Sequence, residues 1–235
     1  MRVACLGGGP AGLYFAISMK LRDPSHEVTV FERNRPDDTF GWGVVLSDEA
    51  LGNLAANDPV SAAAIRENFA YWDDIAVEFK GTRTVSSGHG FCGIGRMKLL
   101  MLLQARAREL GVELRFQTSV SEKEIEQLAR DHDIVVASDG LNSLTRNKYA
   151  EHFRPDVDVR RCKFVWLGTK QKFDDAFTFI FKETDKGWLW AHAYQFDAET
   201  ATFIVECAHD TWNAYGFGEM TQQESISTCE RVSSE

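Results

Sequence analysis

Residues 7–12 have the composition and spacing of a phosphate-binding turn. They read Gly-Gly-Gly-Pro-Ala-Gly, after a short buried strand over residues 2–6 and before a helical apolar pattern over residues 13–21. Gly7 permits a tight turn, Gly9 lets the backbone approach a pyrophosphate, and Gly12 lets the helix pack closely on the strand. The helix start attracts the diphosphate, and Pro10 suits it because no donor is needed there. The turn therefore predicts dinucleotide binding.

A carboxylate lies at the position where dinucleotide-binding folds bind a ribose. Residues 27–31 form a second alternating strand that ends at Glu32, twenty positions after Gly12. A carboxylate there accepts hydrogen bonds from both ribose hydroxyls and repels a 2′-phosphate, which favours FAD or NAD over NADP. The alternative is a glycine-rich turn beside a solvated glutamate. The order of strand, helix and acidic residue favours the nucleotide site.

A further strand and turn extend this nucleotide-binding region. Residues 133–137 are continuously apolar, and residues 138–146, Ser-Asp-Gly-Leu-Asn-Ser-Leu-Thr-Arg, form a turn that leads into another helix. An Asp-Gly turn alone is commonplace, so its structural and its binding interpretations are equally open. Arg96 opens a third helical pattern over residues 97–110.

The second half of the chain changes to short strands rich in aromatic and β-branched residues. Polar turns separate them at residues 174–175, 185–187 and 197–199, which predicts an antiparallel sheet. The predicted strands cover residues 162–168, 177–181, 188–194 and 202–207, with one more at residues 75–80 and a closing helix at residues 220–232.

Several of these segments resemble one protein family. Asp-Gly-x-x-Ser-x-x-Arg, from Asp139 to Arg146, resembles a motif of the class A flavoprotein monooxygenases. Residues 41–46, 164–169, 191–194 and 203–207 resemble the branch that contains salicylyl-CoA 5-hydroxylase, 2-aminobenzoyl-CoA monooxygenase and a monooxygenase of violacein biosynthesis. The resemblance extends from residue 1 to about residue 227.

The resemblance implies an α/β fold with a Rossmann-like FAD-binding domain of the GR2 type. This domain is expected at residues 1–156, with a strand insertion near residues 70–95, and an inserted antiparallel β-sheet substrate domain is expected at residues 157–235. Family members continue with a Gly-Asp motif and long helices that return to the FAD domain. This sequence has neither, so we expect a truncated copy with an incomplete substrate domain.

The resemblance also implies ligand contacts. The Asp139 motif holds the pyrophosphate region and is linked to nicotinamide use, and Arg96 reaches the FAD phosphates. Residues 41–46 form the loop that leaves the second strand and passes the isoalloxazine. A solvated Arg96, a buried structural Trp42 and an outer-layer position for His192 and Tyr194 are the alternatives. The expected cofactor contacts are Gly7, Gly9, Pro10, Ala11, Gly12, Glu32, Arg33, Gly43, Arg96, Asp139, Gly140 and Arg146, and the expected substrate contacts are Trp42, His192 and Tyr194.

In that family NAD(P)H reduces FAD, which then reacts with dioxygen and transfers oxygen to an electron-rich aromatic ring. The resemblance implies this reaction here, on an aromatic substrate such as an aryl-CoA thioester. The cofactor supplies the chemistry, so no catalytic side chain is assigned and no metal ligand is expected. A non-catalytic FAD- or ADP-binding fragment is the second interpretation, and an NAD-dependent dehydrogenase is the third.

Composition excludes several other classes. Of the 235 residues, 44% are apolar and 26% are charged, which is typical of a packed globular protein. The net charge of -9 argues against a nucleic-acid surface. No long apolar run or signal-peptide pattern is present, so we expect a cytoplasmic protein without a membrane partner. Five widely spaced cysteines predict neither a disulfide framework nor a zinc site.

Overall fold

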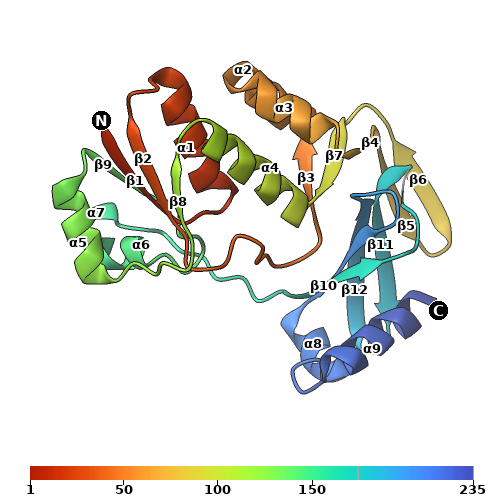
Figure 1. Cartoon of the computed structure of the whole chain (residues 1–235). Helices are drawn as coiled ribbons and strands as arrows, with labels where there is room; N and C mark the ends of the chain where they lie inside the picture. The colour runs from red at the N-terminus through yellow and green to blue at the C-terminus, as the bar shows by residue number, and fades with distance from the viewer. Residues whose placement is uncertain (174, 235) are drawn as a thin grey trace. The chain divides into compact units, whose positions relative to one another are not determined.

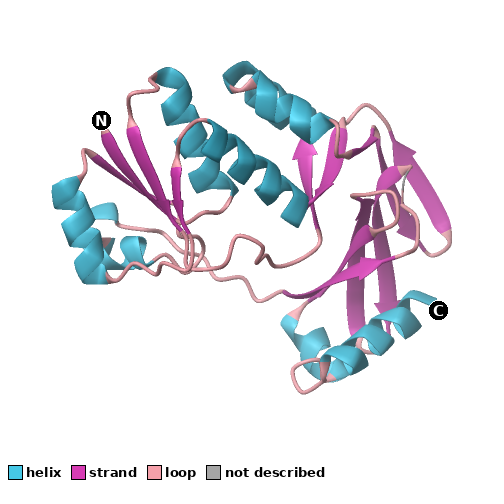
Figure 2. Cartoon of the chain, viewed as in Figure 1, coloured by secondary structure: helices cyan, strands magenta, loops and turns pink. Residues whose placement is uncertain are grey.

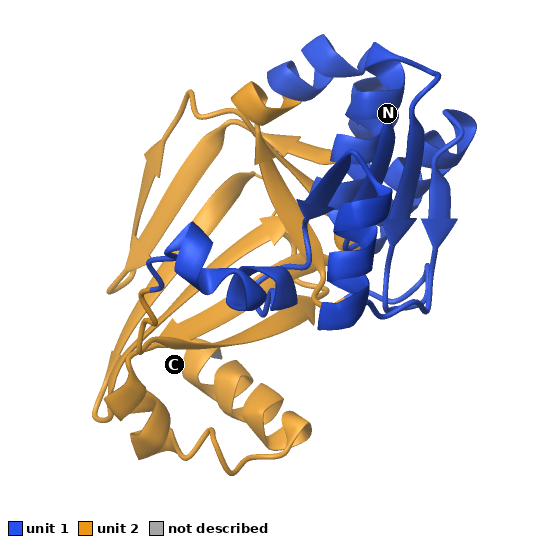
Figure 3. Ribbon diagram, turned by 90° about the vertical axis from the view of Figure 1, so that its left-hand side faces the viewer, with its two compact units in different colours: residues 1–39, 52–67, 97–157 blue, residues 40–51, 68–96, 158–235 orange. Residues whose placement is uncertain are grey.

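The chain divides into two compact units, each assembled from three separate stretches of sequence (Figure 3). The computed structural model describes residues 1–173 and 175–234. Unit 1 comprises residues 1–39, 52–67 and 97–157, and unit 2 comprises residues 40–51, 68–96 and 158–235. Segments 40–51 and 68–96 thus lie within the unit that also contains the last third of the chain.

Unit 1 is built on a four-stranded sheet in the order β8-β2-β1-β9 (Figure 1). Every pairing in it is parallel, so the connections cross over through helices. The central strand β1 is almost wholly buried, as expected for a parallel strand that is covered on both faces. The strands are β1 (Arg2–Leu6), β2 (Glu27–Phe31), β8 (Glu113–Arg115) and β9 (Ile134–Ala137).

Helices cover both faces of this sheet, with α1 and α5 on opposite sides (Figures 1 and 2). On one face Ala4 and Leu6 of β1 pack with Ile125 of α5. Helix α5 begins in a capping box between Ser121 and Glu124. The helices of unit 1 are α1 (Pro10–Arg22), α3 (Pro59–Arg66), α5 (Glu122–Asp131), α6 (Leu144–Lys148) and α7 (Ala150–Phe153), while α2 (Asp48–Asn57) and α4 (Arg96–Glu109) begin in unit 2 and continue in unit 1.

Unit 2 contains a six-stranded sheet in the order β10-β13-β12-β11-β5-β6 and a three-stranded sheet in the order β3-β7-β4. The longest strands, β11 and β12, form a hairpin whose turn ends at Gly187. The strands are β3 (Gly43–Ser47), β4 (Ala70–Trp72), β5 (Asp74–Phe79), β6 (Thr82–Ser86), β7 (Phe91–Gly95), β10 (Lys163–Thr169), β11 (Ala176–Thr184), β12 (Gly187–Gln195) and β13 (Ala201–Cys207).

The two faces of the six-stranded sheet differ in character. One packs against α8 (His209–Tyr215) and α9 (Gln222–Ser234) through Leu189, Val205 and Cys229. The opposite face, here called the aromatic face, is set by the period-2 alternation of the paired strands. It includes the aromatic residues Phe79, Phe164, Trp166, Phe177, Phe179, Phe181, Trp188, Trp190, His192 and Tyr194, together with Ile75, Val77, Glu183, Thr202, Ile204 and Glu206.

The structure confirms the predicted α/β fold, with a parallel nucleotide-type sheet and a separate sheet rich in antiparallel pairs. One pairing departs from the antiparallel pattern, because β5 runs parallel to β11. The segment 41–46, expected to be a loop, contributes strand β3, which pairs with β7. Of the predicted turns, residues 174–175 lie partly outside the described residues, since residue 174 is not among them.

Candidate functional site

The turn between β1 and α1 needs glycine at two positions for steric reasons. Gly7 has a φ of +105°, and a Cβ there would lie 2.3 Å from the carbonyl oxygen of Ser138. A Cβ on Gly12 would lie 2.0 Å from the carbonyl oxygen of Gly7 and 2.5 Å from Ser138 Oγ. The tight turn thus depends on Gly7, and the close approach of α1 to the turn depends on Gly12.

The start of α1 leaves room for a ligand. Gly9 is the N-cap residue, it supplies no side-chain cap, and a Cβ built on it meets no atom within 4 Å. Pro10 occupies the first turn, and Ala11 beside it is exposed. The first N–H groups of a helix lack intrahelical acceptors, so an open helix start offers donors and positive potential to an anion. This geometry suits a diphosphate.

Glu32 lies next to the glycine turn, at the end of β2. Its Oε2 accepts a hydrogen bond from the Gly8 N–H at 2.7 Å, and its Oε1 accepts one from the Asn34 N–H at 2.8 Å. These two bonds fix the orientation of the carboxylate. An ionised carboxylate accepts about four hydrogen bonds, so two further acceptor positions remain for ribose hydroxyls.

Ser138, which follows β9, joins that strand to the glycine turn. Its Oγ lies 2.9 Å from the carbonyl oxygen of Leu6 and 3.0 Å from that of Gly7, and its N–H donates to Leu6. Neither Ser138 nor Gly8 was predicted as a site residue. The available signal for Ser138 was a polar residue directly after an apolar strand, next to the Asp-Gly turn.

Asp139 organises the turn after β9. Its Oδ1 accepts from Ser143 Oγ at 2.6 Å, and its Oδ2 accepts from the N–H and hydroxyl of Thr145 at 3.2 and 3.3 Å. Burial by itself raises the pKa of this carboxyl, but the hydrogen bonds from Ser143 and Thr145 outweigh burial and lower the pKa. Asp139 is therefore a charged group that holds the turn in one conformation.

Substitution of Asp139 by asparagine is expected to lower the free energy of unfolding at pH 7 by about 1 kcal/mol, because the three charge-assisted hydrogen bonds to its carboxylate are weakened. The pKa of Asp139 is lower in the folded protein than the value of about 3.9 in the unfolded chain. The ionised carboxylate therefore stabilises the folded protein above about pH 3.9, and this stabilisation is lost as the pH falls through the folded pKa. Urea unfolding at pH 7 and pH 3 measures it. The matched control is the exposed Asp156→Asn, and equal effects of the two variants at pH 7 would contradict the assignment.

The other predicted residues of unit 1 lie in or beside these turns. Gly140 has a φ of +80°, and a Cβ on it would meet no atom within 4 Å. The Arg146 guanidinium donates to the carbonyl oxygen of Leu141 at 2.8 Å, and Arg33 is exposed after Glu32. The glycine turn, Glu32 and the Asp139 turn follow β1, β2 and β9, which are neighbours in a parallel sheet. Their carboxyl ends form the edge where such sheets bind ligands.

Within unit 2, Gly43 is held between strands. Its N–H donates to Thr202 Oγ1 at 3.0 Å, its carbonyl accepts from the Tyr194 hydroxyl at 2.8 Å, and a Cβ on it would lie 2.6 Å from Phe196. These contacts join the three-stranded sheet to the six-stranded sheet. The backbone N–H and C=O of Gly43 are therefore hydrogen-bonded within the protein, and the space beside its Cα is filled by Phe196.

Trp42 and Arg96 lie close to Gly43. Trp42 is 46% exposed, and its ring lies so close to Gly168 that a Cβ there would be 2.6 Å from the ring. The Arg96 N–H donates to the carbonyl oxygen of Trp42 at 2.8 Å, which fixes the start of α4 beside β3. Trp42 is thus a half-exposed ring supported by a glycine of β10.

His192 and Tyr194 both belong to the aromatic face but have different surroundings. Tyr194 is 4% exposed, and its hydroxyl is used by Gly43. His192 is partly buried between the rings of Phe177 and Phe179, with centroids at 6.0 and 5.9 Å. Among the described residues, no hydrogen bond to its ring nitrogens is formed. Only His192 of the two therefore has polar atoms available to a ligand.

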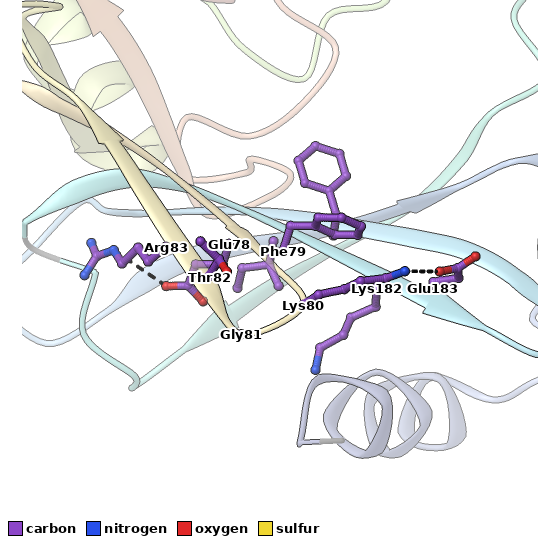
Figure 4. Close-up of a pocket in the computed structure, with 10 residues that line it drawn as sticks. Glu78, Phe79, Lys80, Gly81, Thr82, Arg83, Lys182 and Glu183 are labelled. Atoms are coloured by element: carbon purple, nitrogen blue, oxygen red, sulfur yellow. Dashed lines mark ion pairs between the residues drawn. The ribbon is translucent and has the colours of Figure 1, made fainter.

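A pocket of about 640 Å³ lies at the β5–β6 hairpin and β11 (Figure 4). Two ion pairs line it, with Lys80 Nζ at 2.9 Å from Glu183 Oε2 and Arg83 Nε at 3.8 Å from Glu78 Oε1, and Lys182 lies beside them. None of the predicted site residues lines it. We assign it no ligand.

Within residues 1–173 and 175–234, no group of three or more His, Cys, Asp or Glu residues could hold a metal ion. No helix in the same part of the chain is long and apolar enough to cross a bilayer. All five cysteines are free, and burial raises the pKa of the Cys5 thiol to about 12. Cys5 therefore carries no thiolate at neutral pH.

Known proteins resemble this chain in sequence and in fold. The chain is 45% identical over 217 residues to salicyloyl-CoA 5-hydroxylase of Streptomyces sp, a match that covers 92% of this chain and 41% of that protein. It is 34% identical to protodeoxyviolaceinate monooxygenase of Chromobacterium violaceum, covering 99% of this chain and 62% of that protein. No family model matches the chain.

Among solved structures, the fold resembles that of the tetrameric form of 2-methyl-3-hydroxypyridine-5-carboxylic acid oxygenase. The TM-score is 0.72 at 18% identity, over 88% of this chain and 58% of that one. The chain thus spans between about two fifths and three fifths of the length of the proteins it matches. The solved structure shows the fold, and the sequence identities of 45% and 34% give the assignment: the chain belongs to the class A FAD-dependent aromatic monooxygenases.

Proposed function

We propose that unit 1 binds the ADP half of FAD. The main support for this proposal is the uncapped start of α1, which has open space at Gly9 and lies beside the fixed carboxylate of Glu32. The donors of the helix start would hold the diphosphate, and Glu32 would accept from the ribose hydroxyls. The FAD contacts proposed within unit 1 are Gly7, Gly9, Pro10, Ala11, Gly12, Glu32, Arg33, Asp139, Gly140 and Arg146.

We further infer that the protein hydroxylates an aromatic ring with NAD(P)H and dioxygen. When bound, FAD accepts electrons from NAD(P)H and activates dioxygen for transfer of one oxygen atom to the ring. The residues of this chain would bind and orient the reactants and keep water away. The 45% identity to a salicyloyl-CoA 5-hydroxylase supports an aryl-CoA thioester as substrate, with Trp42 and His192 among its contacts.

Flavin binding is tested by purifying the protein, adding FAD and recording the visible absorbance of the desalted sample. A flavin spectrum at one equivalent is expected, with NADH or NADPH consumed after addition of salicyloyl-CoA. Bound FAD without turnover would reduce the function to that of a nucleotide-binding module. Protein that stays colourless after reconstitution would overturn the proposal.

The role of Glu32 gives a residue-level prediction. Glu32→Gln removes the charge but keeps the size, so we expect FAD to bind about tenfold more weakly, which corresponds to about 1.4 kcal/mol. Quenching of flavin fluorescence on binding measures the dissociation constant. Glu151→Gln, at an exposed position of α7, serves as control. Unchanged affinity in Glu32→Gln would rule out the ribose contact.

A further inference from the structure

The free edge of β10 lines a second pocket of unit 2, here called the edge groove. Its walls include Trp42, residues 166–169 of β10 and the face of α9 that carries Gln222 and Ile226, and its volume is about 370 Å³. Small-molecule sites commonly have volumes of about 300–1,000 Å³. The edge groove is therefore large enough to hold an extended, chain-like part of a ligand.

Strand β10 is at the end of its sheet, which leaves one of its edges open to the groove. In the described part of the chain it pairs with β13 alone, so every second N–H and C=O group has no strand partner. Alternation places Trp166 and Gly168 on the aromatic face, and Leu167 and Thr169 on the opposite face. Because residues of both faces line the edge groove, it extends around the edge of the sheet from the aromatic face to α9.

The walls of the edge groove suit an uncharged ligand. Among the described residues that line it, Glu230 is acidic and none is basic. Trp42 contributes a ring that is 46% exposed. The Nε1–H of Trp166 is buried without an acceptor among the described residues, and an unpaired donor carries a free-energy cost. A phosphate would find no cation in this lining, whereas a carbonyl oxygen would supply the acceptor that the indole lacks.

The register of the sheet connects the edge groove to His192. Ile204 of β13 lies directly across from His192 on one side and from Trp166 on the other, so the three side chains form a row on the aromatic face. All three are partly exposed. Neighbouring strands lie about 4.8 Å apart, so the row crosses about 10 Å of the sheet. A ligand that contacts His192 can therefore reach the edge groove along this row.

The polar groups on either side of this row are engaged within the protein. On one side Gly43 is hydrogen-bonded to Thr202 and to Tyr194. On the other side Glu206 is the cross-strand partner of Trp190, and its Oε2 accepts the Trp190 Nε1–H at 2.6 Å. The row between them offers an extended ligand an apolar path that neither neighbour occupies.

We propose that the edge groove binds the pantetheine arm of an aryl-CoA substrate, while the aromatic ring lies beside His192 and the phosphates extend beyond the groove. The arm is uncharged and carries two secondary amides, which would pair with the free edge of β10 as an added strand does. Its backbone equals about four to five extended residues, or about 15 Å, which exceeds the row of about 10 Å from His192 to Trp166. The inference rests on the proposed function and specifies how its thioester is recognised.

The test uses the full chain with FAD added and two probes, salicyloyl-CoA and salicyloyl-N-acetylcysteamine, which keeps the aryl thioester but lacks most of the arm. Calorimetry measures both dissociation constants, and absorbance measures the FAD content of each sample. Gln222→Trp places a large side chain in the edge groove, so it should weaken salicyloyl-CoA binding about tenfold or more and change binding of the short thioester less than about twofold. Gln223→Trp, at the next exposed position of α9, is the matched control.

The outcomes separate this inference from the proposed function. Protein without FAD contradicts the proposed flavin site, and calorimetry of the two thioesters still decides on the groove. Equal binding of both thioesters by the wild-type protein, or an equal effect of Gln222→Trp on both, overturns the edge groove alone, and binding of neither overturns the substrate and the groove together. If Gln222→Trp does not fold, hydrogen exchange decides: salicyloyl-CoA should slow exchange of the β10 amides more than the short thioester does, and equal exchange overturns the inference.

Discussion

Gly12→Ala is expected to destabilise unit 1 by about 4 kcal/mol and to abolish FAD binding. The added Cβ would lie 2.0 Å from the carbonyl oxygen of Gly7 and 2.5 Å from Ser138 Oγ. Neither atom can yield easily, because Gly7 belongs to the turn backbone and Ser138 Oγ is bonded to Leu6 and Gly7. Helix α1 must therefore move away from β1, which removes its donors from the diphosphate. Urea unfolding and flavin absorbance measure the two effects.

The matched control is Gly52→Ala on α2. Gly52 is also a helical glycine, but a Cβ on it meets no atom within 4 Å. Alanine should stabilise this helix by about 0.5–1 kcal/mol because it has the higher helix propensity. The same chemical change is thus expected to have opposite signs at the two positions. Similar effects at both would show that α1 does not depend on contact with the glycine turn.

The second large effect is expected from Arg106→Met on α4, with a loss of about 3–5 kcal/mol in the free energy of unfolding. Arg106 Nε and Nη2 each lie 3.0 Å from a carboxylate oxygen of Asp58, which is 1% exposed. Ser61 Oγ donates to the same carboxylate at 2.6 Å. Burial raises the pKa of Asp58, but Arg106 and Ser61 together lower it below its usual range. Without Arg106 a buried charge remains uncompensated.

Acid should reduce this loss. In the wild-type protein, ionised Asp58 adds to the free energy of unfolding above the unfolded pKa of about 3.9, and this contribution falls as the pH drops below that value. In Arg106→Met the effect is opposite, because protonation of Asp58 removes the uncompensated buried charge. Unfolding of Arg106→Met and of Asp58→Asn/Arg106→Met at pH 7 and pH 4 tests this, with the exposed Arg66→Met as control. The double variant should recover part of the loss, and a loss independent of pH would contradict the ion-pair explanation.

The nucleotide-binding half of the fold could be predicted from the sequence because its signals are local. The glycines, the helix start at Pro10 and the strand that ends at Glu32 lie within about thirty residues and act on one another directly. The bonds from Gly8 and Asn34 to Glu32 could not be predicted, since they depend on the conformation of two turns. The bonds of Ser138 Oγ to Leu6 and Gly7 depend on the same turns, although the position of Ser138 directly after an apolar strand is visible in the sequence.

The arrangement of unit 2 is much less accessible from the sequence. The family resemblance makes residues 41–46 a loop, yet the pairing of β3 with β7 makes Gly43–Ser47 a strand. That pairing joins segments some fifty residues apart, and propensity carries little information about such partners. The Trp190–Glu206 bond is equally non-local, because it follows from the register of β12 on β13.

The parallel pairing of β5 with β11 imposes an order of assembly during synthesis. Roughly 100 residues separate the two strands, and a ribosome adds about 5–20 residues per second, so β5 and β6 emerge about 5–20 s before their partner. The parallel sheet of unit 1 has all its strands once residue 137 has emerged, well before β11. The nascent chain therefore carries an unpaired hairpin edge, open to wrong partners, while the nucleotide-binding sheet is already able to close.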